Sequence, residues 1–338
     1  MIIKVSIVIP CRNEAKYIAR CLNSIVNTEF DKNYLNVFVC DGNSNDGTRE
    51  IIENYEKSFS FIHLLDNPKQ ATPFALNIGI NEAPADIKII LGAHAEIHSD
   101  YIKECIKAFS KGNNIGCVGG IIDNIPENKT SELISLAMSS SFGVGNAYFR
   151  TGAKEGYVDT VAFGAYKSEV FKQIGLFDED LIRNQDDEFN FRLIKSGYKI
   201  FLSKSIRAKY YVRGSFKKLF RQYYQYGYWK VYVNKKHKTI TTIRQCIPLL
   251  FVLFLGLGIL FSFFSILILK LFFIVNILYI IFSLYAALCL TNGISNIFKI
   301  LFTFFILHFS YGAGYFEGIV NFLVLRNNPS LKSTVLSR

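Results

Sequence analysis

Long apolar runs near the C-terminus restrict the fold of this chain more than any other feature. Ile247–Leu269 is an uncharged run of 23 residues and Leu271–Leu290 is another of 20, with only Lys270 between them. A helix needs about 20 mostly apolar residues to cross the hydrocarbon core of a bilayer. Each run is therefore long enough to span a membrane, and the two form either a tight hairpin or one broken segment.

A third apolar stretch, Ile300–Leu325, includes His308 and Glu317. A charge inside a membrane span is costly, and it usually points inward or lies at the interface. Cations flank the apolar region on both sides: Lys235–Lys238 and Arg244 before it, and Arg326, Lys332 and Arg338 after it. Because Lys and Arg are enriched on cytoplasmic flanks, both flanks are expected in the cytoplasm. This favours two spans plus an interfacial or re-entrant third segment, and three spans is the alternative.

The segment Phe216–Lys238 combines cations with aromatic residues and contains no acid. Its cations include Lys217, Lys218, Arg221, Lys230, Lys235, Lys236 and Lys238, and its aromatic residues include Phe216, Phe220, Tyr223, Tyr224, Tyr226, Tyr228 and Trp229. This composition is typical of a helix at a bilayer interface. The formal net charge of +11 is concentrated here, beside the apolar runs, which favours anionic lipid headgroups over nucleic acid as the partner.

Strands and helices are predicted to alternate through the N-terminal part of the chain. The expected strands are Ile2–Ile9, Leu35–Cys40, Phe61–Leu65, Ile87–Leu91 and Ile115–Ile122, and the expected helices are Glu14–Val26, the segment after Thr48, Thr72–Ile80 and Tyr101–Phe109. Nearly continuous apolar strands alternating with helices are typical of a parallel α/β sheet covered on both faces. The glycine-rich segment Asp123–Ala165 is interpreted as an acceptor loop rather than a plain surface connection.

The cysteines and the N-terminus both indicate a cytoplasmic domain. Seven cysteines are scattered without CxxC spacing, which indicates buried small side chains in a reducing compartment rather than a zinc site or a disulfide framework. The opening residues, MIIKVSIVIP, are too short and too strand-like for a signal peptide.

Polar residues follow the predicted strands at the edge where ligands bind in open α/β sheets. They are Arg12, Asn13 and Glu14 after the first strand, Asp41-Gly42-Asn43-Ser44 after the second, and Gly92-Ala93-His94-Ala95-Glu96 after the fourth. Asp41 is either a turn former or a carboxylate that accepts hydrogen bonds from a nucleobase or ribose, and Asp46 is interpreted as a helix N-cap. No GxGxxG follows the first strand and no GxxxxGK[ST] occurs, so a dinucleotide fold and a P-loop are not expected.

The segment Asn184–Leu193, NQDDEFNFRL, places three acids at the start of a predicted amphipathic helix. Acids are favoured in the first turn of any helix, so an ordinary helix start is one interpretation. The other is a general base near a bound sugar.

Three segments in this order, VSIVIPCRNE, VCDGNSNDGT and NQDDEFNFRL, resemble the opening, nucleotide-binding turn and catalytic-base segment of family 2 inverting glycosyltransferases of the GT-A type. The stretch FGVGNAYFRTGAKEGYVDTVAFGAYKSEVF is similar to bacterial enzymes that elongate lipid-linked exopolysaccharide units, the succinoglycan type among them. The resemblance implies an α/β fold: a GT-A (nucleotide-diphospho-sugar transferase, Rossmann-like) domain followed by C-terminal transmembrane helices. It implies a domain at residues 1–215, an interfacial region at 216–245, a membrane region at 246–326 and a tail at 327–338.

The resemblance also implies roles for individual residues. Pro10, Arg12, Glu14 and Asp41 correspond to the donor-nucleotide site, with Asp41 facing the uracil. Asp186 corresponds to the catalytic base, Asp187 is the alternative, and Glu188 orients a neighbour or the acceptor. Gln222 and Trp229 correspond to the acceptor side, although the family's Gln-x-x-Arg-Trp pattern is not reproduced.

One position departs from the family pattern. Its Asp-x-Asp, which holds a divalent cation against the donor diphosphate, reads Gly92-Ala93-His94 in this chain. His94 and Glu96, with His98 as a further candidate, are the potential ligands of Mn²⁺ or Mg²⁺, and Mg²⁺ prefers oxygen donors. The alternative is a metal-independent site in which Arg150 or Lys154 stabilises the leaving diphosphate.

The resemblance therefore predicts an enzyme of the cytoplasmic membrane of bacteria that moves a sugar from a UDP donor onto a polyprenyl-diphosphate-linked glycan. The base takes a proton from the acceptor hydroxyl as the nucleoside diphosphate departs in one displacement. A processive polysaccharide synthase and a catalytically silent nucleotide-binding scaffold are the alternatives.

Overall fold

In the computed structural model, which describes residues 2–212 and 214–329, the chain divides into two units. The first unit contains Met1–Asn124 and Ala147–Tyr211, and the second contains Ile125–Asn146 and Val212–Arg338. The domain expected at 1–215 is thus interrupted, because 125–146 groups with the C-terminal helices. Lys332 and Arg338, expected to flank the apolar region, lie outside the described residues.

A mixed sheet forms the centre of the first unit, with the order β3-β2-β1-β4-β8-β6-β9-β5 and with β7 paired to β9. The strands are β1 (Val5–Cys11), β2 (Leu35–Asp41), β3 (Ile62–Asp66), β4 (Ile87–Ile90), β5 (Ala95–Ile97), β6 (Ile115–Ile125), β7 (Gly156–Val158), β8 (Ala162–Lys167) and β9 (Lys199–Tyr211).

The parallel half of the sheet confirms the alternation seen in the sequence. Val5 of β1 lies opposite Leu35 of β2 on one side and opposite Ile87 of β4 on the other, both in parallel register. The rest of the sheet corrects the expectation of a wholly parallel one: β8 runs antiparallel to β4, with Ala165 opposite Ile89. Local apolar patterns do not encode pairing direction, so the sequence did not reveal this reversal.

Helices pack on both faces of this sheet. The helices of the first unit are α1 (Ile18–Val26), α2 (Thr48–Ser58), α3 (Thr72–Glu82), α4 (Tyr101–Ala108), α7 (Tyr148–Thr151), α8 (Ser168–Ile174) and α9 (Gln185–Lys195), with 3₁₀ turns η1 (Lys32–Tyr34) and η2 (Phe109–Lys111). Alternation along β1 separates the two cores: Ile7 packs in the cluster that contains Leu22 of α1, and Val8 packs in the cluster that contains Leu76 of α3. This period of two is the geometry of a strand buried on both faces.

The glycine-rich segment Asp123–Ala165 folds into short elements rather than one loop, and its parts belong to different units. Residues 125–146 carry α5 (Lys129–Met138) and α6 (Ser141–Val144). The α5 helix begins with a capping box between Asn128 and Ser131, which fixes its first turn.

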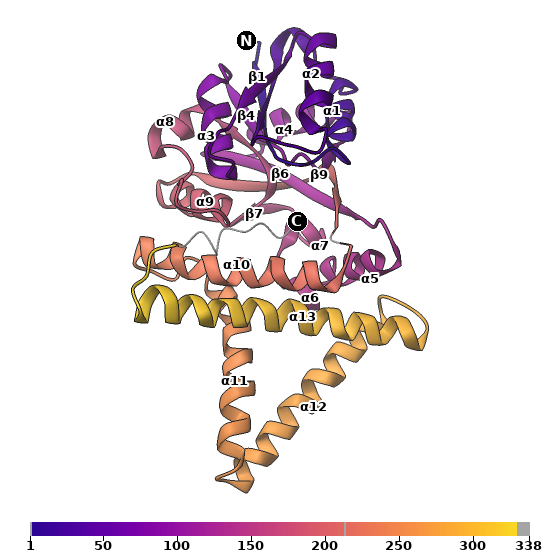
Figure 1. Cartoon of the computed structure of the whole chain (residues 1–338), viewed down its shortest axis with the longest axis vertical. Coiled ribbons are helices and arrows are strands. Elements are labelled where there is room, and N and C mark those ends of the chain that lie inside the picture. The colour runs from indigo at the N-terminus through magenta and orange to yellow at the C-terminus, as the bar shows by residue number, and fades with distance from the viewer. Residues whose placement is uncertain (1, 213, 330–338) are drawn as a thin grey trace. The chain divides into compact units, whose positions relative to one another are not determined.

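The remaining helices of the second unit are α10 (Phe216–His237), α11 (Ile247–Ser262), α12 (Ile266–Leu288) and α13 (Ile294–Gly318), with a 3₁₀ turn η3 (Ile243–Cys246) before α11 and a π-helical turn η4 (Ile319–Val324) after α13. Figure 1 shows α10 and α13 side by side, while α11 and α12 extend from this pair and meet at their far ends. Within the described residues, three helical segments are long and apolar enough to cross a membrane: Ile243–Ser262, Ile266–Leu288 and Ile294–Val324.

Glycines allow α13 to approach its neighbours closely. A Cβ atom on Gly314 would lie 2.0 Å from the carbonyl oxygen of Tyr224 in α10, and a Cβ on Gly312 would lie 2.0 Å from that of Pro248 in α11. Small residues at such crossings bring helix backbones into direct contact. The glycines of the third apolar stretch are therefore packing positions.

Candidate active site

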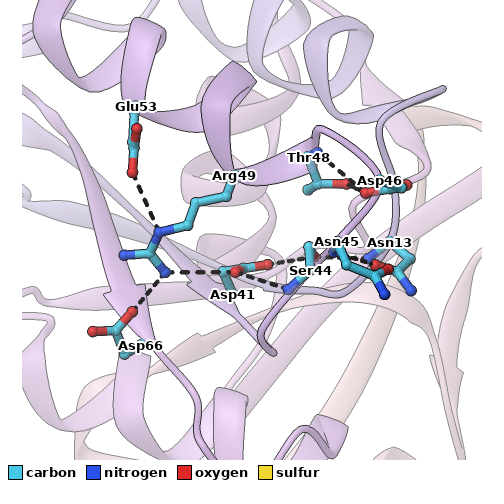
Figure 2. Close-up of polar contacts among 9 residues, drawn as sticks. All are labelled: Asn13, Asp41, Ser44, Asn45, Asp46, Thr48, Arg49, Glu53 and Asp66. Carbon is cyan, nitrogen blue, oxygen red and sulfur yellow. Dashed lines mark hydrogen bonds and ion pairs between the residues drawn. The ribbon is translucent and has the colours of Figure 1, made fainter.

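Asp41 lies at the carboxyl end of β2, is fully buried, and anchors the turn that follows (Figure 2). Its Oδ1 accepts a hydrogen bond from the Ser44 hydroxyl at 2.5 Å, and its Oδ2 accepts one from the Ser44 N–H at 3.2 Å. The Arg49 guanidinium lies 3.6 Å from Oδ2 and also binds Asp66 at 2.7 Å and Glu53 at 3.3 Å. A carboxylate offers about four lone-pair sites, so Asp41 keeps the capacity to accept one further donor.

The loop after β1 is tied to the same turn by reciprocal hydrogen bonds. The Asn13 N–H donates to Ser44 Oγ at 2.8 Å, and the Asn45 N–H donates to Asn13 Oδ1 at 3.0 Å. The Glu14 N–H donates to Thr48 Oγ1 at 2.8 Å. Asn13 has a φ of 54°, a conformation that asparagine tolerates better than most residues. The two loops thus form one rigid edge.

Gly42 leaves little room for a side chain at this edge because other chain segments approach it closely. A Cβ atom there would lie 3.3 Å from Cβ and Cδ of Arg12 and from Cα of Gln70. The Arg12 stem therefore lies over the turn that Asp41 anchors. The structure thus brings Arg12, Glu14 and Asp41 together, and Pro10 is the penultimate residue of β1 beside them.

Asp46 does not occupy the N-cap predicted for it, because the N-cap of α2 is Gly47 with a φ of 92°. One residue earlier, Asp46 accepts hydrogen bonds from Ala15 N–H at 3.2 Å and from the N–H and hydroxyl of Thr48 at 3.1 and 2.5 Å. Partial burial alone would raise the pKa of Asp46, but the hydrogen bonds from Thr48 and Ala15 outweigh it and hold this pKa below its usual value.

Asp46→Ala is expected to lower the free energy of unfolding by about 1 kcal/mol at neutral pH. A carboxylate whose pKa is lower in the folded state stabilises the protein above its unfolded pKa, and this contribution is lost as the pH falls through the folded pKa. Thermal melting of both proteins at pH 7 and near pH 3 checks this, with the exposed Glu50 changed to Ala as a control. If the melting temperatures of the two proteins differ by the same amount at both pH values, the stabilising role of the Asp46 charge is contradicted.

The segment after β4 has no carboxylate at the position where the family has its first aspartate. A Cβ atom on Gly92 would lie 3.2 Å from Cε1 of Phe163 and 3.3 Å from Cε1 of His94, so these rings occupy the space into which an aspartate would extend. Phe163 has a φ of 50°, which is rare for a bulky residue and marks local strain. His94 Nδ1 lies 3.8 Å from Glu14 Oε1, and the His94 ring stands edge-on to Tyr210 with centroids 5.2 Å apart.

Two of the three expected cation ligands at this edge are engaged with other side chains. Glu96, the second expected ligand, accepts hydrogen bonds from the Tyr211 hydroxyl and from Lys209 Nζ. His98 lies 3.9 Å from Asp123, a carboxylate that also pairs with Arg207. Among the described residues, no group of three or more His, Cys, Asp or Glu side chains is placed to hold a metal ion.

Arg150 and Lys154, the expected cationic alternatives, differ in their surroundings. The Arg150 guanidinium lies 5.3 Å from the ring centroid of Tyr210, the same ring that His94 contacts, and its Nη1 donates to Asn124 Oδ1 at 3.1 Å. Lys154 lies 5.4 Å from the ring centroid of Tyr148. Arg150 is therefore the cation that shares a neighbour with His94.

The three acids open α9 as predicted, but their environments differ. Asp186 is exposed and Asp187 is partly exposed, with the Asp187 N–H donating to Asp186 Oδ1 at 2.9 Å. Glu188 is only 2% exposed and forms a bidentate ion pair with Arg192 at 2.7 and 2.9 Å. Glu188 thus holds the helix in place, which leaves Asp186 and Asp187 as candidates for the base.

Asn190 connects this helix to the edge that carries His94. Its side chain donates to Thr160 Oγ1 at 3.1 Å and accepts from the Tyr166 hydroxyl at 3.0 Å. Thr160 precedes β8, the strand that carries Phe163 next to Gly92. Asp186 lies one turn before Asn190 on the same helix face, so it points towards the same edge.

The expected acceptor-side residues lie on α10 in the second unit. Gln222 is 1% exposed and donates to the Tyr226 hydroxyl at 2.9 Å. Trp229 is fully buried and packs against Tyr232 and Phe322 with ring centroids 6.0 and 6.3 Å away. Within the described part of the chain, the Trp229 Nε1 has no hydrogen-bond partner.

Sequence reasoning missed three residues that shape the site: Arg49, Phe163 and Arg192. Arg49 left a signal, since a cation in the first turn of a helix opposes the helix dipole and implies a compensating carboxylate. Arg192 is four residues after Glu188, the spacing of a helical ion pair. Phe163 left no local signal, because its φ is imposed by the strands and rings around it.

Comparison with known proteins identifies relatives of this arrangement. A family model described as Glycosyl transferase family 2 matches residues 6–175. Dolichyl N-acetyl-alpha-D-glucosaminyl phosphate 3-beta-D-2,3-diacetamido-2,3-dideoxy-beta-D-glucuronosyltransferase of Methanococcus voltae is 36% identical over 231 residues, 66% of this chain and 71% of that protein. Succinoglycan biosynthesis protein ExoA of Rhizobium meliloti (strain 1021) is 31% identical over 246 residues, 72% of this chain and 74% of that protein.

Two solved structures share the fold at low identity. Mannosyltransferase PcManGT from Pyrobaculum calidifontis, in complex with GDP-Man and Mn²⁺, has a TM-score of 0.52 at 18% identity over 66% of this chain and 62% of that one. S. aureus TarS 1-349 in complex with UDP has a TM-score of 0.50 at 17% identity over 68% of this chain and 65% of that one. The first of these was crystallised with a divalent cation, and both establish the fold of residues around the site rather than its chemistry.

Proposed function

The chain belongs to glycosyl transferase family 2 and is a glycosyltransferase with a GT-A fold, and from this premise we propose that it moves a sugar from a UDP donor to a lipid-linked glycan. The donor nucleotide would bind at the edge formed by Arg12, Glu14 and Asp41, and Pro10 would line the same pocket. We place the product in surface or extracellular polysaccharide assembly, a proposal supported by a relative named for succinoglycan biosynthesis.

Convergence of three distant segments carries this proposal. Glu14, after β1, lies 3.8 Å from His94, and Asn190 of α9 donates to Thr160 at 3.1 Å, just before β8, whose Phe163 lies next to Gly92. These contacts support placing the Asp41 turn, the Gly92–His94 segment and the start of α9 around one donor. A donor bound by the first segment would place its diphosphate at the second. The third segment then supplies a carboxylate near the anomeric carbon.

The chemistry follows from these residues. Asp186 accepts the proton of the acceptor hydroxyl, whose oxygen attacks the anomeric carbon as the bond to the diphosphate breaks. The leaving diphosphate needs charge neutralisation rather than a proton, so one base is sufficient. Arg150 supplies that charge beside His94, and a guanidinium matches phosphate oxygens in bidentate geometry. Because the attack is in line, the anomeric configuration inverts.

A lipid-linked acceptor is supported by the second unit and by one relative. The Methanococcus voltae protein is named for a dolichyl-linked acceptor. Apolar α11 and α12, together with the basic aromatic helix α10, suit attachment to the cytoplasmic face of a membrane. Gln222 and Trp229 of α10 are proposed to serve the acceptor side. Because one of these relatives is archaeal and the other bacterial, the membrane could belong to either kind of cell.

The test is sugar transfer by the purified full chain from a panel of nucleotide sugars to a polyprenyl-diphosphate-linked acceptor extract, with Mn²⁺, with Mg²⁺ and with EDTA. Transfer from a UDP-sugar that changes less than about twofold in EDTA is expected, because the diphosphate is stabilised by Arg150. Activity lost in EDTA and restored by Mn²⁺ would place a cation in the site and contradict this. UDP binding without transfer from any donor would favour a silent scaffold, and long polymeric products would favour a processive synthase.

Arg150→Ala extends this test and is expected to lower kcat by about tenfold to a hundredfold. Lys154→Ala is the matched control, since this cation lies in the same segment but stacks on Tyr148 instead of Tyr210. An equal loss in both variants would indicate a general effect of positive charge on the segment.

A further inference from the structure

We propose that α10 and α13 lie flat on the anionic surface of a bilayer as one in-plane pair, and that only α11 and α12 enter the hydrocarbon core. Although α13 with η4 has the length and hydropathy of a membrane span, it would not cross. This inference deepens the membrane attachment within the proposed function, and its test does not depend on transfer activity.

Charge keeps α10 out of the hydrocarbon core. Six cations lie along this helix: Lys217, Lys218, Arg221, Lys230, Lys235 and Lys236. A Lys or Arg at the centre of a membrane helix is costly, so such residues rarely face the hydrocarbon. Lys217, Lys218, Arg221 and Lys236 are exposed, so they are available to anionic headgroups near both ends of the helix.

Contacts hold α13 beside α10 along its length, in parallel. Near their starts, Phe302 meets Phe216 with ring centroids 5.2 Å apart. In the middle, Gly314 lies against the backbone of Tyr224.

Tyr315 accepts a hydrogen bond from Asn234 Nδ2 at 2.8 Å, and Phe322 of η4 packs against Tyr232 with centroids 5.0 Å apart. A Cβ on Gly227 of α10 would lie 2.0 Å from the carbonyl oxygen of Tyr311, so the backbones touch from this side as well. Because the helices are parallel and in contact from Phe302 of α13 to Phe322 of η4, this part of α13 must take the depth of α10. Half of the apolar window of α13 is buried inside the protein, against none for α11 and 6% for α12.

The α11–α12 hairpin is arranged to enter and return. Pro248, at the start of α11, touches Gly312 of α13, and Tyr279 of α12 hydrogen-bonds His308 of α13 at 3.0 Å. Figure 1 shows both helices leaving the α10–α13 pair on one side and meeting at their far ends. At that turn Phe263 is 83% exposed. The segments Ile243–Ser262 and Ile266–Leu288 contain 20 and 23 residues, so each is long enough to cross the hydrocarbon core, which is about 30 Å thick.

Exposed phenylalanines lie on one face of α13, on either side of Gly312, where α11 packs. Phe298, Phe302, Phe305 and Phe316 are exposed, and their spacing of four, seven and eighteen residues from the first places them on one stripe of the helix. An apolar stripe beside exposed cations is the pattern of a helix pair seated in the headgroup region, with rings towards the acyl chains. The partner is therefore an anionic lipid surface.

The experiment measures depth along the helix. Single cysteines replace Phe298, Phe305, Phe316 and Val324 in the full chain, are labelled with an environment-sensitive dye, and are quenched by lipids brominated at known acyl positions. The vesicles contain phosphatidylethanolamine and phosphatidylglycerol. Cys246 and Cys289 are first changed to Ser, because the other five cysteines are buried, and burial raises the pKa of Cys21 and Cys40 to about 12.

Equal, shallow depths at the four positions are expected. A spanning α13 would instead separate Phe298 from Phe316 by about 27 Å along the membrane normal, at about 1.5 Å per residue, and that result would overturn the inference. The matched series on α12, at Leu267, Ile274, Ile281 and Leu288, should vary in depth in the same vesicles. If both series escape quenching, the membrane attachment itself fails, whereas α12 quenched with a depth-varying α13 overturns only the in-plane pair.

Discussion

Replacing Asp186 with asparagine is expected to lower kcat for sugar transfer by about 10³-fold or more, while the Kd for the donor nucleotide stays unchanged. Asparagine keeps the size and the hydrogen-bonding reach of the side chain, but its neutral amide cannot act as a base. The exposed Asp186 lies one turn before Asn190, whose bond to Thr160 fixes this face of α9 at the donor edge. Loss of the base therefore removes the proton transfer without disturbing the binding of nucleotide at the Asp41 turn.

Asp187→Asn is the matched control for this prediction, because the two residues are adjacent and point in different directions from the helix. Asp186 and Asp187 lie four and three residues before Asn190, so both are within one turn of it. If Asp186 is the base, the kcat of Asp187→Asn should fall by less than about tenfold. The measurement is single-turnover transfer together with UDP binding for both variants. A large loss in Asp187→Asn with near-normal turnover in Asp186→Asn would move the base by one residue, and near-normal turnover in both would remove the base from this helix.

Arg192→Met is expected to lower the free energy of unfolding by about 3 kcal/mol or more, which corresponds to a fall in melting temperature of about 6–12 °C. The change leaves the Glu188 carboxylate buried without its bidentate partner. It also removes hydrogen bonds from Arg192 to the carbonyl oxygens of Ile174 and Leu176, at 2.5 and 2.7 Å. The removal of one partner from a buried ion pair costs far more than the pair itself contributes.

Thermal melting of the full chain measures this, with Lys195→Met as the control because Lys195 is an exposed cation on the same helix. The control should change the free energy of unfolding by less than about 0.5 kcal/mol. Adding Glu188→Leu to Arg192→Met removes the stranded charge and should recover part of the loss. If Arg192→Met melts like the control, Glu188 is not held as a structural carboxylate, and it returns to the candidates for direct contact with substrate.

Together these experiments separate the two functions that the acidic segment combines. Asp186 is exposed and Asp187 is partly exposed, so either is available to an acceptor hydroxyl, whereas the carboxylate of Glu188 is buried and positions the helix. Adjacent residues on a helix point about 100° apart, so a run of acids necessarily faces different surroundings. The amino-acid sequence alone does not determine which of the three acids faces the donor.

The sequence by itself determined the parts of this protein that depend on local pattern. The apolar strands of β1 to β4, the helices between them and the acidic start of α9 follow from periodicity and end signals, and the structure confirms them. The length of the apolar runs fixed which segments are able to enter a membrane. Signature segments around Asp41 and Asp186 led to the family, which the comparisons confirm.

Only the tertiary structure decided which residues meet and in which direction the chain returns. The antiparallel strands β8 and β9 pair with residues far away in the sequence, and these neighbours set the φ of Phe163. A local sequence pattern therefore predicts neither the strand pairing nor this φ. Gly92 is explained only by the ring of Phe163 beside it. The sequence left the third apolar segment open between an interfacial helix and a span, and the structure adds its contacts with the charged helix α10, which support the in-plane pair proposed above. Local sequence determines which structure a segment favours by itself. Pairing register, burial and the depth of a helix depend on interactions with residues that are far away in the sequence.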